Sequence, residues 1–207
     1  MKNTFLTGSH LKIDIEHKLR SGEKIVLELG CGPNKQPGRI GIDRLDFPEV
    51  DIVADLNEGF PFLPDHCVDE IHSKSLFEHI EDLGFFMREI LRVLKPGGRN
   101  FLFVPHFSNP YYYSDYTHTR FIGLYTFYYF ADEKNQLRRK VPHFYTDVRI
   151  RIVSQRLIFQ STFRGVNFLK KLFGNLVNLS SWTQEFYEEN LCYLIPCYGM
   201  EIVFESA

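Results

Sequence analysis

Ile25-Val26-Leu27-Glu28-Leu29-Gly30-Cys31-Gly32 is the stretch of this 207-residue chain that decides its fold. Aliphatic and β-branched residues run up to one acidic residue and then to a Gly-x-Gly pair, a pattern typical of a buried parallel strand that ends in a tight turn. Glycines in such a turn can adopt positive φ and let backbone N–H groups approach a ligand closely. Because ligands bind at the carboxyl edge of the strands in open α/β sheets, the stretch predicts a ligand site directly after this strand.

Two later strand-like runs also end on an acidic residue, at Asp43 and at Asp55. Together with Glu28, these carboxylates would repel the phosphates of a dinucleotide, but they would hold an ammonium, a sulfonium or a ribose diol. Lys35 stands where the Gly-x-Gly-x-x-Gly dinucleotide fingerprint has its third glycine. Charge complementarity therefore favours S-adenosylmethionine over NAD as the ligand.

Several motifs of the chain resemble those of class I S-adenosylmethionine-dependent methyltransferases, and they occur in the order typical of that family. The matching segments are 28–32, Asp43, Asp55-Leu56, 68–73 and 89–98. The resemblance covers about residues 24–104 and implies a small bacterial methyltransferase type 11-like domain with S-adenosylmethionine as its cofactor. It implies as cofactor-binding residues Glu28, Gly30, Cys31, Gly32, Asp43, Asp55, Leu56 and Ser73.

The link between the first two expected strands departs from the pattern of that family. Residues 31–38 contain two prolines, so the usual first helix is reduced to a turn or two at most. A parallel crossover normally takes a dozen residues or more. We therefore expect an unusually short first crossover and an altered methionine end of the cofactor pocket.

The order of expected elements suits an α/β fold with a Rossmann-like, seven-stranded, mostly parallel sheet, helices on both faces and an antiparallel last strand. The length fits a single methyltransferase domain over 1–207, with 24–104 as the cofactor-binding half and 105–207 as the substrate or lid half. Strands are expected at 24–29, 39–42, 50–54, 68–73, 100–104, 147–159 and 199–204, and helices at 9–20, 83–94 and 166–179.

The expected helix at 166–179 carries an apolar stripe with basic residues beside it. We expect the stripe to cover a face of the sheet, since an apolar helix stripe needs burial. The alternative is contact with an anionic membrane surface, where Arg164, Lys170 and Lys171 would meet lipid head groups.

Three histidines near the expected strand ends are candidate catalytic bases. His79 follows the fourth strand, His106 follows the fifth, and His118 lies in the loop beyond it. A base is needed if the methyl acceptor is a hydroxyl, whereas methyl transfer otherwise depends chiefly on positioning. We rank His118 first, because Asp115 and Arg120 flank it and could orient its ring, and His106 and His79 after it.

We do not expect a metal site in this chain. The segment 75–79 resembles the Glu-x-x-Glu-His run that holds a divalent ion in some methyltransferases of ubiquinone biosynthesis and small-RNA 2′-O-methylation, but Ser75 replaces the first ligand. Glu78, His79 and His106 would still offer one carboxylate and two imidazoles, a set better suited to zinc or iron than to magnesium. We expect instead that Glu78 orders the turn through hydrogen bonds.

Charge is distributed unevenly along the chain, although the formal net charge is only −2. Residues 43–89 contain 13 acidic and three basic residues, whereas residues 134–171 contain ten basic residues and one acidic residue. The basic block is either solvated surface or a face for an anionic acceptor. No nucleic-acid-binding signature accompanies it.

Cellular location is predicted from the cysteines and the apolar runs. The four cysteines show no metal-like spacing, and the first residues contain no apolar run. These features predict reduced thiols in a cytoplasmic protein.

The function predicted from these observations is S-adenosylmethionine-dependent O-methylation of a small or glycan-like acceptor. Ten aromatic residues within 111–130 could form a wall for that acceptor, or pack as core and lid. Two alternatives stay open: a catalytically silent methyltransferase-like binding protein, and an enzyme that binds NAD or a nucleotide sugar.

Overall fold

The computed structural model describes residues 9–207, which form two compact units. Unit 1 contains the described residues up to Leu76, residues 80–102 and Ser206. Unit 2 contains residues 77–79, residues 103–205 and Ala207. The strand β6 (Leu94–Pro105) therefore begins in unit 1 and ends in unit 2.

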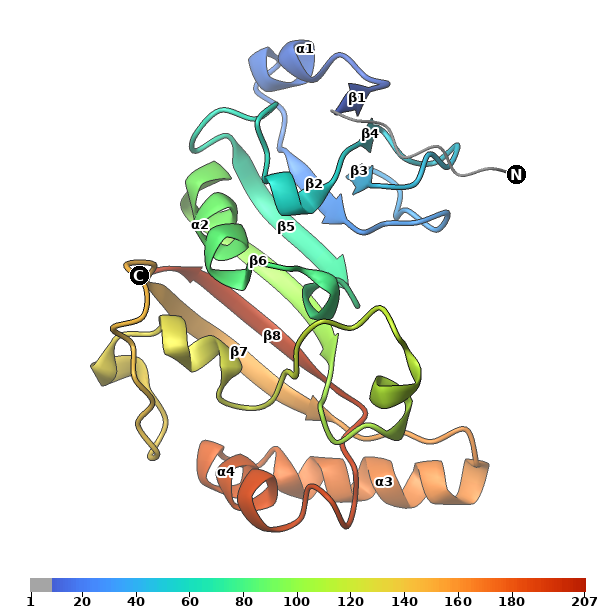
Figure 1. Cartoon of the computed structure of the whole chain (residues 1–207), viewed down its shortest axis with the longest axis vertical. Helices are drawn as coiled ribbons and strands as arrows, with labels where there is room; N and C mark the ends of the chain where they lie inside the picture. Colours follow the sequence, from blue (N-terminus) through green and yellow to red (C-terminus); the bar gives the residue numbers. More distant parts are fainter. Residues whose placement is uncertain (1–8) are drawn as a thin grey trace. The chain divides into compact units, whose positions relative to one another are not determined.

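Unit 1 is built on a sheet whose strand order is β1-β4-β3-β2-β5-β6 (Figure 1). The central strand β2 (Val26–Leu29) pairs in parallel with β3 (Ile40–Asp43) and with β5 (Val68–Lys74). The short strand β4 (Ile52–Val53) is parallel to β3, whereas β1 (His10–Leu11) is antiparallel to β4 at the edge. This parallel core confirms the prediction made from the opening stretch of sequence.

The register of the parallel strands gathers their carboxyl ends. Leu29 lies opposite Ile42 on one side and opposite Ser73 on the other. The turn after β2, the end of β3 and the end of β5 consequently share one edge of the sheet in unit 1.

The helix α2 (Leu83–Val93) packs its apolar side into unit 1. It starts at Asp82, whose Oδ1 accepts a hydrogen bond from Phe85 N at 2.9 Å. Phe86, Met87 and Ile90 are fully buried, and Figure 1 shows α2 lying across β5 and β6. The expected stop after this helix is confirmed, but the strand that follows starts at Leu94 and not at residue 100.

The prediction of one helix over residues 9–20 is only partly correct. Residues 10–11 form β1, and the helix α1 (Ile15–Arg20) begins later. The reason is Asp14, whose Oδ1 accepts a hydrogen bond from His17 N at 2.8 Å and so caps the helix at that point. A one-turn 3₁₀ helix, η1 (Leu56–Glu58), follows β4.

Unit 2 contains the last two strands, β7 (Ile150–Ile158) and β8 (Gly199–Ser206), in the order β6-β8-β7. Tyr198 N donates to Ile158 O and Ala207 N donates to Arg149 O, so β7 and β8 are antiparallel. Two helices, α3 (Arg164–Val177) and α4 (Ser181–Asn190), follow β7. The remaining turns are 3₁₀ helices: η2 (Phe77–His79), η3 (Pro110–Ser114), η4 (Thr126–Phe130) and η5 (Glu133–Asn135).

The observed fold class agrees with the predicted mixed, mostly parallel Rossmann-like sheet. The described residues form eight strands and not seven, because the two-residue β1 adds an edge strand beside β4. The helix α4 was not predicted. Its start could have been recognised from Ser180, which forms a reciprocal capping box with Thr183.

The apolar stripe of α3 is buried only in part and not along its whole length as expected, since Phe173 packs against Phe159 beside the end of β7. Only Gly174 and Val177 of this helix are buried, whereas Phe168, Leu169 and Leu176 are each more than half exposed. The sequence pattern correctly predicted an amphipathic helix, but periodicity alone does not determine which surface an apolar stripe meets.

No helix between residues 9 and 207 has the length and apolar character needed to cross a bilayer. The four cysteines all lie within this described range, and none of them forms a disulfide.

Candidate functional site

The turn after β2 has the backbone geometry that the sequence predicted. Gly30 and Gly32 have φ values of 64° and 52°, in the left-handed region that favours glycine. A Cβ atom on Gly30 would lie 3.3 Å from Leu76 Cδ1, whereas one on Gly32 would meet nothing within 4 Å. The space beside Gly32 therefore leaves its backbone open to a ligand.

Asp43 closes this turn from the end of β3. Its Oδ2 accepts a hydrogen bond from Gly32 N at 2.9 Å, and its Oδ1 accepts one from Leu45 N at 2.9 Å. Each carboxylate oxygen has a second lone pair, and the residue is half-buried. Asp43 is thus fixed by the backbone in a position where it can still accept hydrogen bonds from a ligand.

Glu28 lies at this edge and also anchors the segment that links β2 to β3. Its Oε2 accepts hydrogen bonds from Gln36 N at 2.9 Å and from Arg39 Nη1 at 3.5 Å. The sequence did not predict the contact of Arg39 with Glu28, because Glu28 lies 11 residues earlier, on β2.

The short crossover between β2 and β3 contains no helix, as the two prolines predicted. Asp51 holds it: its Oδ2 accepts hydrogen bonds from Lys35 Nζ at 2.5 Å and from Gly41 N at 2.8 Å. A Cβ atom on Gly41 would lie 2.6 Å from Lys35 Cδ and 2.7 Å from Cys31 Sγ. Glycine at position 41 therefore lets the link pack directly on β3.

The other predicted cofactor residues lie at the same strand ends of unit 1. Asp55 is exposed and caps η1 through a 2.9 Å hydrogen bond from Asn57 N to its Oδ1, while Leu56 is buried. Ser73 is buried at the end of β5, and its Oγ has no hydrogen-bond partner within the described residues. Burial, with the nearby charges of Asp43 and Glu28, raises the pKa of Cys31 to about 12, so the thiol stays protonated.

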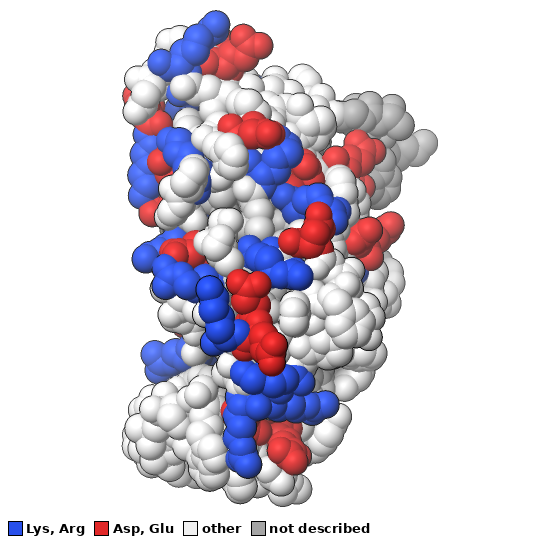
Figure 2. Space-filling model, turned by 90° about the vertical axis from the view of Figure 1, so that its left-hand side faces the viewer, with Lys and Arg blue, Asp and Glu red and all other residues white. Residues whose placement is uncertain are grey.

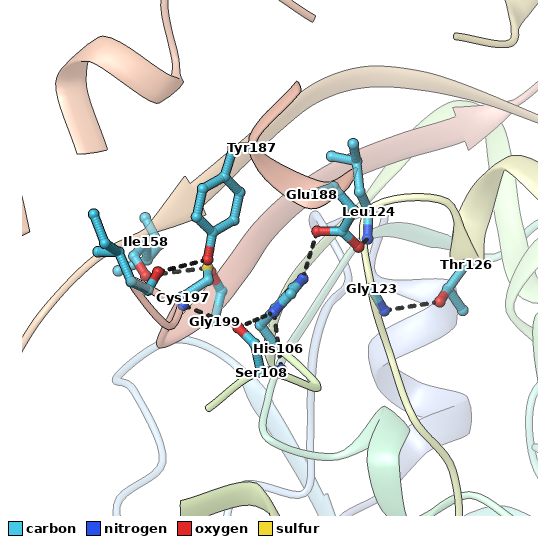
Figure 3. A network of polar contacts seen from close by, with 11 residues as sticks. His106, Ser108, Gly123, Leu124, Thr126, Ile158, Tyr187, Glu188, Cys197 and Gly199 are labelled. Atoms are coloured by element: carbon cyan, nitrogen blue, oxygen red, sulfur yellow. Dashed lines mark hydrogen bonds and ion pairs between the residues drawn. The ribbon is translucent and has the colours of Figure 1, made fainter. Parts of the chain in front are cut away.

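His106 is fully buried and uses both ring nitrogens within unit 2 (Figure 3). Its Nδ1 accepts a hydrogen bond from Ser108 N at 3.1 Å, and its Nε2 donates to Glu188 Oε2 at 2.8 Å. Glu188 Oε1 in turn accepts from Leu124 N at 2.9 Å. This network joins the loop after β6 to α4, and it favours a positioning role for His106 over proton transfer.

His79 and His118, the other two candidate bases, lie together in unit 2. Their ring centroids are 4.8 Å apart. His118 Nδ1 lies 2.9 Å from Tyr112 O, and its Nε2 lies 3.6 Å from Asp115 Oδ2. The predicted neighbour Asp115 is thus beside His118, whereas the contact with the Tyr112 carbonyl was not foreseen.

Glu78 does not order the turn through its carboxylate, so that expectation was wrong. The side chain is fully buried, and neither oxygen has a hydrogen-bond partner in the part of the chain that the structure describes. Burial raises the pKa of Glu78 to about 7. The alternative that grouped Glu78 and His79 with His106 is not found either, since the cluster contains His118 and not His106.

The basic block at 134–171 is partly neutralised by acidic partners. Arg149 Nε lies 3.3 Å from Asp132 Oδ1, and Arg151 pairs with Glu205. Figure 2 shows one face of the molecule on which acidic and basic side chains lie next to each other. Arg138 and Arg139 line a pocket of about 320 Å³.

A family model matches part of this chain. Residues 36–102 match a family model described as a methyltransferase domain. No curated protein sequence matches the chain.

Solved structures share the fold at low sequence identity. A SAM-dependent methyltransferase from Archaeoglobus fulgidus is 17% identical over 93% of both chains, with a TM-score of 0.57. The putative methyltransferase solved with the Haloferax volcanii activator Trm112 is 15% identical over 93% of this chain and 88% of its own, with a TM-score of 0.51. Phosphoethanolamine N-methyltransferase 2 of Haemonchus contortus, solved with S-adenosylhomocysteine, is 13% identical over 93% of this chain and 51% of its own, with a TM-score of 0.50. At these low sequence identities, the similarity to the three solved structures shows the fold of this chain and no more.

Proposed function

We propose that this chain binds S-adenosylmethionine and methylates a hydroxyl of a small or glycan-like acceptor. The premise is that the chain has the class I S-adenosylmethionine-dependent methyltransferase fold. The observation that carries the proposal is the Asp43 carboxylate, held by Gly32 N and Leu45 N beside a glycine turn at the strand edge. A fixed acceptor of this kind suits the vicinal hydroxyls of a ribose.

The residues of unit 1 fit the chemical groups of this cofactor. Asp43 would accept hydrogen bonds from the ribose, and the open face of Gly32 would let the cofactor lie against the backbone. Asp55-Leu56 would lie on the adenine side, and the buried Ser73 Oγ offers a further polar contact. When bound, the cofactor supplies a sulfonium methyl group that is open to attack by a nucleophile.

NAD or a nucleotide sugar fits these residues poorly. Such ligands place their phosphates at the N-terminus of a helix that directly follows the first strand. Residues 30–39 form no helix here. The carboxylates of Glu28, Asp43 and Asp55 at this edge would repel phosphates.

The acceptor side is proposed to lie in the residues after β6, with His118 as the group that acts on the hydroxyl. His118 is half-buried, and its Nδ1 faces a carbonyl oxygen that can only accept. The proton therefore sits on Nδ1 in the neutral ring, and Nε2 carries the lone pair that a general base needs. Asp115 beside Nε2 would stabilise the protonated ring.

Titration calorimetry with S-adenosylhomocysteine tests the first half of the proposal, with NAD as the competing ligand. We expect saturable binding of S-adenosylhomocysteine and none of NAD at the same concentration. Tighter binding of NAD would overturn the assignment.

Methyl transfer is tested by incubating the protein with methyl-labelled cofactor and a panel of hydroxylated, amino and anionic sugar acceptors. Transfer to hydroxyls supports O-methylation, and transfer to amines alone would contradict it. Cofactor binding without transfer to any acceptor would favour a catalytically silent binding protein.

A further inference from the structure

Glu78 differs from the buried acids Glu185 and Glu205 of unit 2, because its carboxylate accepts no hydrogen bond within the described residues. Removing a carboxylate from water costs several kcal/mol, so buried carboxylates are normally paired, hydrogen-bonded or bound to a metal. The ionisable neighbour, His79, has its Nε2 4.0 Å from Oε1, which is beyond hydrogen-bond distance. The structure therefore leaves this carboxylate without a protein donor.

The two histidines beside Glu78 are held in one tautomer. His79 Nδ1 lies 3.2 Å from Thr117 O, and His118 Nδ1 lies 2.9 Å from Tyr112 O. A carbonyl oxygen can only accept, so each Nδ1 must carry the proton and each Nε2 must carry a lone pair when the ring is neutral. A backbone carbonyl that accepts from the distal nitrogen is the arrangement typical of metal-binding histidines.

Backbone contacts fix the two segments that supply these side chains. Thr119 N donates to Glu78 O at 2.9 Å, and Thr119 Oγ1 donates to the same oxygen at 3.2 Å. Thr117 Oγ1 in turn donates to Asp115 Oδ1 at 2.6 Å. The loop that bears His118 is thus tied to η2, which bears Glu78 and His79, before any ligand is considered.

We propose that Glu78, His79 and His118 form a binding site for a divalent transition-metal ion such as Zn²⁺. One ligand atom from each residue lies within 4.8 Å of the other two. Zinc ligands lie about 2.0–2.2 Å from the ion, so a small inward movement of the three side chains would complete the site. Two imidazole nitrogens and one carboxylate suit zinc or iron(II), whereas magnesium and calcium prefer oxygen ligands throughout.

A further unpartnered polar atom lies near the cluster. The hydroxyl of Tyr112 is buried without a hydrogen-bond partner in the described chain, and its ring centroid lies 4.5 Å from that of His118. Three protein ligands leave coordination positions for an oxygen from outside. An ion there would occupy the Nε2 lone pair of His118, so it would act on an acceptor hydroxyl as a Lewis acid in place of the general base; this role in turnover rests on the proposed function, whereas binding of the ion does not.

The test is titration of the metal-free protein with Zn²⁺, followed by metal analysis after dialysis. We expect one Zn²⁺ per chain and no comparable binding of Mg²⁺. Glu78→Gln and His118→Ala should each weaken Zn²⁺ binding by more than about 100-fold, which exceeds the effect of losing an outer-shell partner. His72→Ala is the matched control, because His72 lies 3.3 Å from a carboxylate, that of Glu70, but outside the cluster.

A second measurement does not depend on whether the variants fold. Co²⁺ bound to nitrogen and oxygen ligands in a low-symmetry site absorbs visible light, and Zn²⁺ should abolish that absorption by displacing it. Absence of stoichiometric Zn²⁺ binding to the intact chain, or Zn²⁺ affinity unchanged in both Glu78→Gln and His118→Ala, would overturn the inference.

Binding of S-adenosylhomocysteine separates this inference from the proposed function. If S-adenosylhomocysteine binds and Zn²⁺ does not, the metal site is overturned while the proposed function stands. If Zn²⁺ binds and S-adenosylhomocysteine does not, the metal site stands and the proposed function fails.

Discussion

The two groups of candidate residues differ in how their carboxylates are satisfied. At the strand edge of unit 1, Asp43 accepts hydrogen bonds from Gly32 N and Leu45 N. In unit 2, Glu78 is more deeply buried and accepts none within the described residues. The backbone thus completes the first site by itself, whereas the second contains a carboxylate that needs a proton or a cation.

This difference separates two kinds of function for an acidic residue. A carboxylate that the backbone already holds is preorganised to receive a neutral hydroxyl at little cost. A carboxylate that the protein leaves unpaired favours a positively charged ligand. The following predictions test this division.

The largest effect is expected from His118→Ala, which removes the proposed base or metal ligand of unit 2. Turnover should fall by about 10²–10⁴-fold, the usual contribution of a positioned proton-transfer group. The affinity for S-adenosylhomocysteine should stay as it is, because the proposed cofactor residues lie in unit 1. Steady-state rates and calorimetry on the same preparation test both statements, and full activity in the variant would remove His118 from the mechanism.

A smaller effect is expected from Asp43→Ala at the strand edge. Affinity for S-adenosylhomocysteine should fall by about 1.5–3 kcal/mol, the range for hydrogen bonds to a charged group. Calorimetry measures this loss, and Asp46→Ala, at a more exposed acid three residues further on, is the control. An unchanged affinity in Asp43→Ala would exclude Asp43 from the cofactor site.

Glu89 provides a paired carboxylate whose behaviour on acidification can be measured. The hydrogen bond from Arg92 lowers its pKa below the ordinary value of 4.5, and Phe60 N donates to the same carboxylate at 2.9 Å. A carboxylate whose pKa is lowered on folding stabilises the folded state at pH values above its ordinary pKa. This stabilisation is lost as the pH falls through the folded-state pKa.

Glu89→Gln should therefore lower the free energy of unfolding at neutral pH by about 1.5–3 kcal/mol. The difference from the unsubstituted protein should shrink as the pH falls below 4.5. Urea unfolding across this range measures it. A difference that stays constant with pH would show that lost packing, and not charge, accounts for the effect.

His106→Ala should act on stability and leave cofactor affinity unchanged. Removing the imidazole leaves Glu188 and Ser108 without their buried partner, which costs about 1–3 kcal/mol. Urea unfolding tests the loss, with His17→Ala at an exposed position as the control. Normal stability combined with lost turnover would instead support His106 as a catalytic group.

The smallest effect is expected at α3, whose apolar stripe is exposed beside Arg164 and Lys171. An amphipathic helix of this kind binds anionic vesicles through apolar area and charge. We expect weak co-sedimentation that fades with salt and with Lys170→Glu/Lys171→Glu, but not with Lys18→Glu/Arg20→Glu on α1. Absence of binding at low salt would exclude an anionic membrane as the partner of this face.

The strand edge of unit 1 could be predicted from the sequence because its determinants are local. Each strand, its terminal acid and the Gly-x-Gly turn lie within a few consecutive residues, and parallel pairing places successive strand ends at one edge. The prolines of the crossover likewise predicted that no helix would form there. The hydrogen bonds from Arg39 to Glu28 and from Lys35 to Asp51 join separate segments, so no local pattern indicated them.

The sequence by itself determined the parallel core, the turn after β2 and the amphipathic character of α2 and α3, because strand and helix periodicity act over short distances. Tertiary structure alone decided that Glu78 is buried without a donor and that His118, 40 residues further on, replaces His106 beside it. It also decided that most of the stripe of α3 faces outward. Burial and long-range pairing depend on how distant segments pack, and a one-dimensional pattern of residues does not contain that information.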